Sequence, residues 1–288
     1  RLDSLPTSER LVLKRAAIIG RTFWDDLESA LTDEEDEIQH IEKHLASLRE
    51  RGLVYHREHS SIAGSQEYLF KHALLCDAAY ETVLLKHRRQ YHKKVALWIE
   101  ENAGDRLNEH LALIGSHYLE AGLPDRAADW LMRSAERALS QSSMQEAKDL
   151  FERALDLIDE GDLDRVWRAT LGHDQAVGAL GQLDDRHADD KTLLNLAQHL
   201  KDDQRLAEAY YRIGSQAKSE GDNQAALHAL NKALQHAKRM DDMTMQALIL
   251  PMLVTVYTNE GDLHKADPLV ERALTLARET GDADVLAR

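Results

Sequence analysis

The stretch SEGDNQAALHALNKAL at residues 219–234 returns forty residues later as NEGDLHKADPLVERAL at residues 259–274. The identical positions are Glu220, Gly221, Asp222, Ala226, Ala233 and Leu234, which recur as Glu260, Gly261, Asp262, Ala266, Ala273 and Leu274. In each Gly-Asp pair, glycine can take the positive φ of a helix C-terminus and aspartate can cap the next helix. Because the small and apolar residues are spaced by three, four and seven, each copy predicts an antiparallel helical hairpin.

This pattern of small and large residues resembles the tetratricopeptide repeat, whose usual period is about 34 residues. It falls on Tyr210, Ile213, Gly214, Ala217, Ala226, Leu230 and Ala233, and then on Leu250, Leu253, Val254, Tyr257, Ala266, Val270 and Ala273. The same register puts Gly181 at the turn of a degenerate unit. Further repeat positions are Gly115, Tyr118, Gly122, Ala127 and Leu131, followed by Ala147, Phe151 and Ala154. We expect a superhelix of about four hairpins over residues 106–288, with a period near 40 and a truncated last unit.

Composition limits the class of protein. The 288 residues contain 36 Lys and Arg against 51 Asp and Glu, and nearly all of the excess acid lies in residues 95–288. An acidic surface repels phosphate backbones, so we do not expect these repeats to bind nucleic acid. No stretch approaches the 18 apolar residues of a membrane span, and a single cysteine fits a reducing compartment. We therefore expect a cytoplasmic protein, and the missing initial Met suggests an excised piece of a longer one.

The first hundred residues follow another pattern. Residues 5–19 predict a helix capped by Thr7 or Ser8, with Leu11, Leu13, Ala16 and Ala17 inward. Residues 22–31 predict a second helix, and residues 34–52 a third with Ile38, Ile41, Leu45 and Leu48 inward. Residues 53–57 and 66–70 then predict two short strands. Three helices and a hairpin indicate a winged-helix-like module over residues 1–85, joined by a connecting helix over 86–105. The predicted fold is thus all-α with one small β-hairpin.

Two strings carry a more specific resemblance: RLDSLPTSERLVLKRAAIIGRTFW at residues 1–24 and EYLFKHALLCDAAYETVLLKHRRQYHKKVALWIE at residues 67–100. They resemble the segment after the nucleotide-binding domain in large signal-transduction ATPases with numerous domains, including those fused to cyclases, kinases or transcription activators. The matching residues are Arg1, Leu2, Leu5, Pro6, Ala16, Ala17, Gly20, Phe23, Phe70, His72, Ala79, Tyr80 and His92. The resemblance implies that a winged helix links an ATPase core to a tetratricopeptide sensor arm.

The phosphate-binding loop GxxxxGK[ST] is absent from the sequence, so we expect no cofactor in this chain and ATP only on a domain upstream of residue 1. The expected function is a non-catalytic protein-interaction and regulatory segment of a signalling ATPase or transcription regulator. Its partners would be a protein or peptide on the repeat groove and the parent's own nucleotide-binding domain. The alternative is a DNA-binding winged-helix transcription regulator.

Two surfaces are candidate sites. The concave face of the repeats includes Glu109, Ser116, Tyr211, Ser215, Lys218, Thr255, Thr258 and Asn259. A clamp for a terminal carboxylate would need several basic residues there, so a basic or amphipathic segment fits better. The dense basic run KHRRQYHKK contains Lys86, Arg88, Arg89, Lys93 and Lys94. It could contact DNA phosphates or an acidic protein partner. A solvated or intramolecular face is the preferred interpretation, because the third helix begins with four acids.

No residue pattern in the sequence is typical of a catalytic or metal-binding site. His40 and His44 have a spacing that can bind zinc, but they lack HExxH and an evident third ligand. Cys76 is interpreted as a small core residue and His72 as a capping or packing residue. We therefore expect no metal site and no enzyme.

Overall fold

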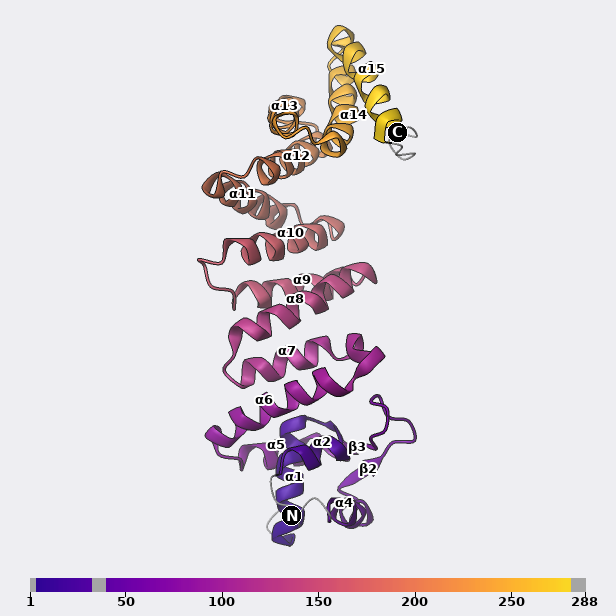
Figure 1. The fold of residues 1–288 in the computed structure, drawn as a ribbon, viewed down its shortest axis with the longest axis vertical. Coiled ribbons are helices and arrows are strands. Elements are labelled where there is room, and N and C mark those ends of the chain that lie inside the picture. The colour runs from indigo at the N-terminus through magenta and orange to yellow at the C-terminus, as the bar shows by residue number, and fades with distance from the viewer. Residues whose placement is uncertain (1–3, 33–39, 281–288) are drawn as a thin grey trace. The chain divides into compact units, whose positions relative to one another are not determined.

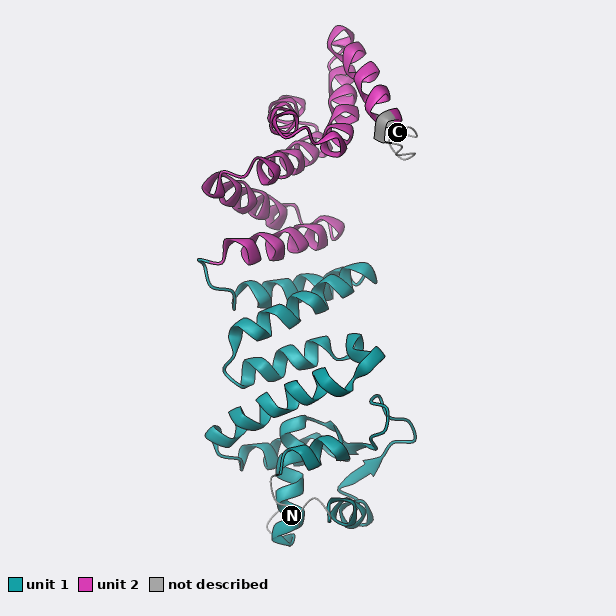
Figure 2. Cartoon of the chain, viewed as in Figure 1, with its two compact units in different colours: residues 1–161 teal, residues 162–288 magenta. Residues whose placement is uncertain are grey.

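The computed structural model describes residues 4–32 and 40–280. The chain forms two compact units, Arg1–Gly161 and Asp162–Arg288 (Figures 1 and 2). The predicted module boundaries at residues 85 and 105 both fall inside unit 1 and stay a prediction. None of the helices in the described ranges is long and apolar enough to cross a membrane.

Unit 1 begins with short helices packed on a small sheet. Its first elements are α1 (Thr7–Ile19), β1 (Thr22–Trp24), α2 (Asp25–Ala30), α4 (Ile41–Glu50), β2 (Val54–His56) and β3 (Glu67–Phe70). The sheet is antiparallel with strand order β1-β3-β2. The predicted hairpin of β2 and β3 is confirmed, with Val54 opposite Phe70.

Residues 22–24 were predicted to start a helix, and this was wrong. They form β1, in which Phe23 and Trp24 are buried and Phe23 lies opposite Tyr68 of β3. The aromatic side chains of Phe23 and Tyr68 stack with ring centroids 5.6 Å apart. Cross-strand aromatic contacts of this kind stabilise sheets, and a short helical pattern does not reveal them.

Helix starts and faces of this region are partly as predicted. Neither Thr7 nor Ser8 caps α1, because Pro6 occupies the cap position and no side chain bonds there. Leu11, predicted inward, is 37% exposed, whereas Leu13, Ala16 and Ala17 are buried as expected. The inward residues Ile41, Leu45 and Leu48 of α4 are confirmed, and Ile38 lies outside the described residues. Gly52 ends this segment with a φ of 65°, which favours glycine.

The rest of unit 1 is a series of packed helices. They are α5 (Ala73–Glu81), α6 (Leu85–Asn102), the 3₁₀ helix η2 (Gly104–Glu109), α7 (Leu111–Glu120), α8 (Pro124–Ser140) and α9 (Met144–Leu155). Successive helices from α6 to α9 pack on one another, as Figure 1 shows. One continuous apolar core runs from α1 and the sheet to Trp130 of α8. At the predicted close crossing, a Cβ on Gly115 would lie 3.2 Å from the Leu131 side chain.

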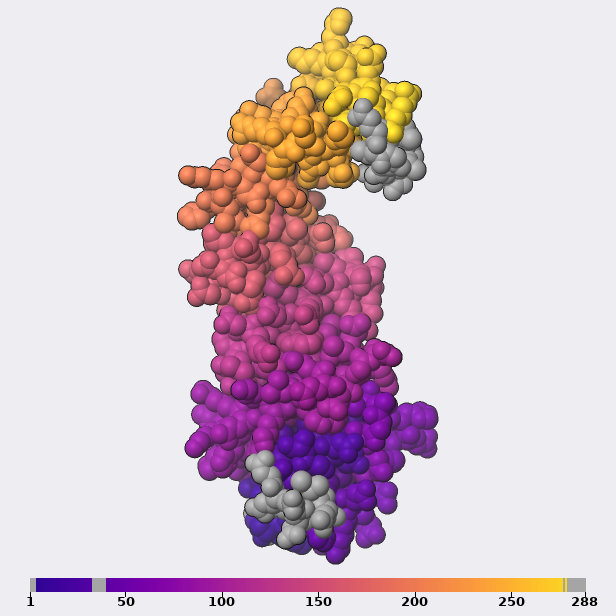
Figure 3. Space-filling view, viewed as in Figure 1, coloured from indigo at the N-terminus to yellow at the C-terminus, as the bar shows by residue number. Residues whose placement is uncertain are grey.

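Unit 2 consists of helical hairpins. Its helices are α10 (Leu163–Ala179), α11 (Leu183–Leu200), α12 (Asp203–Glu220), α13 (Asn223–Arg239), α14 (Met243–Asn259) and α15 (Leu263–Thr280). Gly181, Gly221 and Gly261 turn the chain inside each hairpin with φ of 71°, 83° and 77°. These three turn glycines lie forty residues apart, which is the spacing of the sequence repeat. Figure 3 shows the surface of each unit changing colour in chain order, as expected when each hairpin packs on its neighbours.

Aspartate caps reinforce the same period. The Asp222 carboxylate accepts a hydrogen bond from the backbone N–H of Ala225, as the Gly-Asp pair predicted. Asp162, Asp202 and Asp242, also forty residues apart, cap the first helix of each hairpin in the same way. Sequence analysis overlooked these three caps, although their spacing is visible in the sequence.

Most pattern positions are buried as predicted, including Gly214, Leu230, Leu250 and Leu253. Val270 of α15 is 39% exposed, so its predicted inward position is wrong. Proline removes a backbone donor, which predicts a kink at Pro251 and Pro268 or a later start of the last helix at Pro268. The helices α14 and α15 continue through both prolines, so the later start is not found.

Candidate functional site

The first helices of the last two hairpins, α12 and α14, carry most of the predicted binding face. They contact each other within unit 2. Tyr211, Ser215 and Lys218 are half-buried on α12, at spacings of four and three that place them on one side of the helix. Thr255, Thr258 and Asn259 are exposed on α14 at spacings of three and one. We call these six residues the first-helix face.

The internal hydrogen bonds of this face leave hydroxyl lone pairs that can accept a hydrogen bond from a ligand. The Thr255 hydroxyl donates to the Pro251 carbonyl at 2.9 Å, and the Thr258 hydroxyl donates to the Val254 carbonyl at 2.8 Å. Each hydroxyl oxygen keeps lone pairs that can accept a hydrogen bond from a partner. Tyr211 packs against the apolar cluster of unit 2. The face is therefore polar with an apolar margin and contains one cationic side chain, Lys218.

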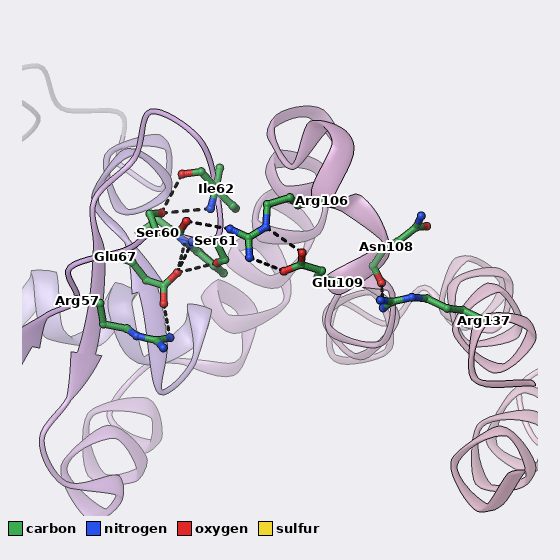
Figure 4. Close-up of polar contacts among 10 residues, drawn as sticks. Arg57, Ser60, Ser61, Ile62, Glu67, Arg106, Asn108, Glu109 and Arg137 are labelled. Atoms are coloured by element: carbon green, nitrogen blue, oxygen red, sulfur yellow. Dashed lines mark hydrogen bonds and ion pairs between the residues drawn. The ribbon is translucent and has the colours of Figure 1, made fainter. Parts of the chain in front are cut away.

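The remaining two predicted residues belong to unit 1. Glu109 lies in η2, where its carboxylate accepts hydrogen bonds from Arg106 at 2.9 and 2.7 Å (Figure 4). The hydrogen bond from Arg106 lowers the pKa of Glu109. The Ser116 hydroxyl of α7 donates to the Ala112 carbonyl at 2.9 Å. Because Glu109 and Ser116 lie in the other unit, the eight predicted residues fall into two separate sets.

Sequence analysis missed a buried carboxylate in unit 1. Glu67 of β3 is 1% exposed, and it accepts hydrogen bonds from the N–H and hydroxyl of Ser61 at 2.8 and 2.7 Å. The Trp24 indole N–H donates to the same Glu67 oxygen at 3.2 Å, and Arg57 donates to the other oxygen at 2.5 Å. Burial by itself would raise the pKa of Glu67, but the bonds from Ser61 and Arg57 outweigh burial and lower it. The only sequence signal is an acid within the apolar strand EYLF.

Further hydrogen bonds connect the β2–β3 loop to η2, and η2 to α8, as Figure 4 shows. Arg106 of η2 donates to the Ser60 carbonyl at 3.0 Å while also pairing with Glu109. Arg137 of α8 donates to the Asn108 carbonyl of η2. The loop, the 3₁₀ helix and α8 are thus linked by side-chain to backbone bonds, and the buried Ile62 also packs the loop into the apolar core of unit 1.

The basic run lies on α6, and its cations have different surroundings. Arg88 is used internally: it donates to the Val83 carbonyl at 2.8 Å and pairs with Glu81 at 2.9 Å. Its guanidinium also lies over the Tyr80 ring, 4.4 Å from the centroid. Lys86, Arg89 and Lys93 are exposed, while Lys94 is half-buried.

A cleft of about 730 Å³ opens beside this run. Lys93 and Lys94 line it together with apolar residues that include Leu11 and Leu97. A lysine beside an apolar surface can bind an acidic, amphipathic segment of a partner.

A buried histidine pair also lies in unit 1. The Nδ1 atoms of His92 on α6 and His117 on α7 are 2.8 Å apart, and the Tyr80 hydroxyl is 3.1 Å from His92 Nε2. Burial, with the nearby Arg88 charge, lowers the pKa of His92 to about 4. Burial, with the His92 charge, lowers the pKa of His117 to about 3. Both rings are therefore neutral at pH 7, and one Nδ1 donates to the other.

The residues considered for catalysis or metal binding are placed as follows. Cys76 is buried, as predicted, and burial raises its pKa to about 11, which opposes thiolate formation. His72 occupies the cap position of α5, but its side chain makes no capping bond. His40 and His44 have ring centroids 6.4 Å apart. Among the described residues, no three His, Cys, Asp or Glu side chains are grouped to hold a metal ion.

One curated relative matches part of the chain. An uncharacterized protein of Rhizobium meliloti, R02095, is 29% identical over 96 residues, which is 33% of this chain and 9% of that protein. The chain thus spans a small part of the relative's length, and the match carries no functional description.

Solved structures show the fold. The apo form of RapI superposes with a TM-score of 0.59 at 10% identity, over 87% of this chain and 62% of RapI. Aspartyl phosphate phosphatase F of Bacillus subtilis gives 0.56 at 12% identity, over 98% and 78% of the two chains. A Rap protein complexed with competence and sporulation factor gives 0.50 at 15% identity, over 88% and 69%.

Helices α12 and α13 cross each other where Gly214 faces Leu230. A Cβ on Gly214 would lie 2.6 Å from Leu230 Cγ, so the small residue is needed for the crossing. The mostly helical fold with one small sheet is confirmed, and so is the repeat pattern at this hairpin. Residues 207–237 match the sequence model of the tetratricopeptide repeat.

Proposed function

We propose that this chain is a non-catalytic protein-interaction and regulatory segment of a larger signalling ATPase or transcription regulator. The observation that carries the proposal is the tetratricopeptide match at residues 207–237, followed by a second hairpin with the same glycine turn. Stacked repeats of this kind bury their cores between neighbours and leave the exposed face of the first helices for a partner.

The first-helix face is the proposed ligand site, and a protein or peptide segment is the proposed ligand. Its hydroxyl and amide groups at Thr255, Thr258 and Asn259 can bond an extended or helical backbone. Because Lys218 is its one cation, the face is better suited to a basic or amphipathic segment than to a free carboxylate. The similar fold of a Rap protein complexed with competence and sporulation factor supports a ligand on such an arm.

Unit 1 is the proposed link to the rest of a longer protein. In this proposal it packs on the parent's own nucleotide-binding domain, where ATP would bind upstream of residue 1, and the protein is cytoplasmic. Ligand binding on the repeats would change how unit 1 rests on that domain. Such coupling requires that the ligand prefers one of two arrangements.

A peptide selection tests the ligand site. A random twelve-residue peptide library displayed on phage would be selected against the full chain, and enriched peptides would be synthesised and titrated by fluorescence anisotropy. We expect enrichment of basic or amphipathic sequences. Thr255→Arg, which adds bulk and positive charge to the exposed first-helix face, should weaken binding by at least about tenfold, or 1.4 kcal/mol.

The matched control is Gln235→Arg, which puts the same side chain at an exposed position of the second helix α13. Gln235→Arg should leave the affinity within about twofold of the unchanged chain. If no peptide is enriched, or if both substitutions weaken binding equally, the first-helix face is not the ligand site.

A further inference from the structure

The degenerate repeat α10–α11 replaces core residues with charged ones. Counting back forty residues from the pattern of α12–α13 gives Thr170, His173, Asp174, Val177, Arg186, Asp190 and Leu193. The close-crossing pair Gly214 and Leu230 thereby corresponds to Asp174 and Asp190. Two carboxyl groups thus stand where the neighbouring repeat packs a glycine against a leucine.

These polar residues are buried and mostly paired. Asp174 is 1% exposed and accepts a hydrogen bond from Arg186 of α11 at 3.2 Å. Arg212 of α12 also donates to Asp174, so this one carboxylate joins three helices. Beside it, His173 Nδ1 lies 2.6 Å from the carboxylate of Asp189.

Asp190 is the exception in this network. It is 4% exposed, and its Oδ1 atom has no hydrogen-bond partner. The charged groups that act on it are Asp174 of α10, Arg186 and His187 of α11, and Arg212 of α12. Burial first, and then the Asp174 charge, raise the pKa of Asp190 to about 7, against the opposing effect of the cations.

The apolar core is interrupted at the same place. The small cluster between α10, α11 and α12 consists of Trp167, Leu193, Ala197 and Ala209. A separate, larger cluster extends from the other side of α12 to α15 and includes Leu230 and Leu253. The contact of α10 and α11 with α12 therefore depends on the charge network more than the next contacts along the chain do.

We propose that the contact of α10–α11 with α12 is a proton-controlled joint, which is closed while Asp190 is protonated and loosens when Asp190 ionises. The two arginines near Asp190 are already engaged by two carboxylates: Arg186 and Arg212 both pair with Asp174, and Arg212 also pairs with Glu208. An ionised Asp190 would therefore add an uncompensated negative charge beside the buried Asp174. A buried carboxylate without full pairing is costly, and opening the contact hydrates it. The joint is independent of the ligand proposed for the first-helix face.

The direction of the pH effect follows from the raised pKa. Between the ordinary aspartate value near 4 and about 7, the closed joint keeps a proton that an open, hydrated Asp190 loses. The closed form is thus favoured at low pH and is weakened as pH rises from about 4 to about 7. The opening equilibrium should increase by up to about tenfold per pH unit below 7 and become flat above it.

Hydrogen exchange of the full chain tests the joint. Amides of α11 would be followed by mass spectrometry between pH 5.5 and 8.0, corrected for intrinsic exchange, with amides of α14 as the internal reference. We expect α11 protection to fall as pH rises to about 7 and then to stay constant, while α14 protection changes little. Asp190→Asn removes the ionisable group with little change in shape and should abolish this pH dependence.

A second variant covers the case in which Asp190→Asn fails to fold. Asp190→Leu puts the leucine found at residue 230 in this place, leaves Asp174 paired with Arg186 and Arg212, and should protect α11 equally at all pH values. Protection of α11 that is constant with pH in the unchanged chain would overturn the proposal. So would the same pH dependence in either variant, because a group other than Asp190 would then be its source.

Discussion

Replacing Gly214 with alanine should destabilise unit 2, although alanine is the better helix former. Gly214 lies on α12 where α13 crosses it, and a Cβ there would lie 2.6 Å from Leu230 Cγ, 2.9 Å from Leu230 Cδ2 and 3.1 Å from the Leu230 nitrogen. Atoms of these types do not approach so closely, so α12 and α13 must separate or Leu230 must move. Leu230 is fully buried, and its backbone is part of α13, so neither change is easy.

The magnitude follows from two opposing contributions. Alanine in place of glycine favours a helix by about 1 kcal/mol. Adding a methyl group to a packed contact typically costs about 1–3 kcal/mol, and the approach to a backbone atom puts Gly214 toward the upper end. We expect a net loss of about 1–2 kcal/mol in the free energy of unfolding. Gly178→Ala is the control in the same unit, because the nearest atoms to its Cβ would belong to the Arg186 side chain, at the ordinary contact distance of 3.4 Å.

Urea unfolding followed by circular dichroism measures both variants. Gly178→Ala should be neutral or slightly stabilising, whereas Gly214→Ala should lower the midpoint. Leu230→Ala removes buried methyl groups and should by itself lower the free energy of unfolding by about 2–5 kcal/mol. In the Gly214→Ala background the same substitution should lower it by less. Equal stabilities of Gly214→Ala and Gly178→Ala, or strict additivity with Leu230→Ala, would refute the close-crossing argument.

Three further outcomes are expected. Asp202→Ala should lower the stability of unit 2 by about 1 kcal/mol, since the carboxylate accepts from two backbone N–H groups. Ser143→Ala, at a cap position without a side-chain bond, should change stability by less than about 0.5 kcal/mol in the same urea assay. Unit 1 should lose stability as pH falls from about 6.5 toward 4. In the unfolded chain His92 and His117 bind protons in this range, whereas in the folded chain their lowered pKa values keep them unprotonated. A pH series of thermal melts checks this, and an unchanged acid sensitivity in His92→Phe with His117→Leu would contradict it. Fluorescence anisotropy with a labelled random-sequence duplex should show no binding at low salt. Affinity that falls steeply with salt, and that Arg89→Glu reduces, would instead favour a DNA-binding winged helix.

Local sequence patterns were sufficient to predict most helices. Glycine is the residue that best tolerates the positive φ at 181, 221 and 261, and the spacing of apolar residues marks the buried side of each helix. The strands β2 and β3 were also evident, because both alternate over a few residues. Residues 22–24 were not, since three residues are too few for a periodic signal and their partner strand lies 45 residues away.

For the candidate sites too, the sequence predicted some features, whereas others depend on neighbours in space. A helix face can be predicted from spacing, so Thr255 and Asn259 of α14 were found as exposed polar residues. Whether a charged residue is free to bind depends on its neighbours in space. Arg88 belongs to a basic run in the sequence, yet the structure uses its guanidinium on Val83, Glu81 and Tyr80.

The sequence by itself thus determined the repeat period, the turns and the inward side of most helices, because backbone conformation and amphipathicity are local properties. Only the tertiary structure decided where Glu67, His117 and Asp190 lie. Each is a polar residue on an element whose pattern predicts exposure or says nothing, and each is buried by contacts with other helices or strands. Burial and charge pairing depend on residues far apart in the chain. The forty-residue period puts Asp190 at a core position, but the charges around it and the buried histidine pair could not be predicted from periodicity.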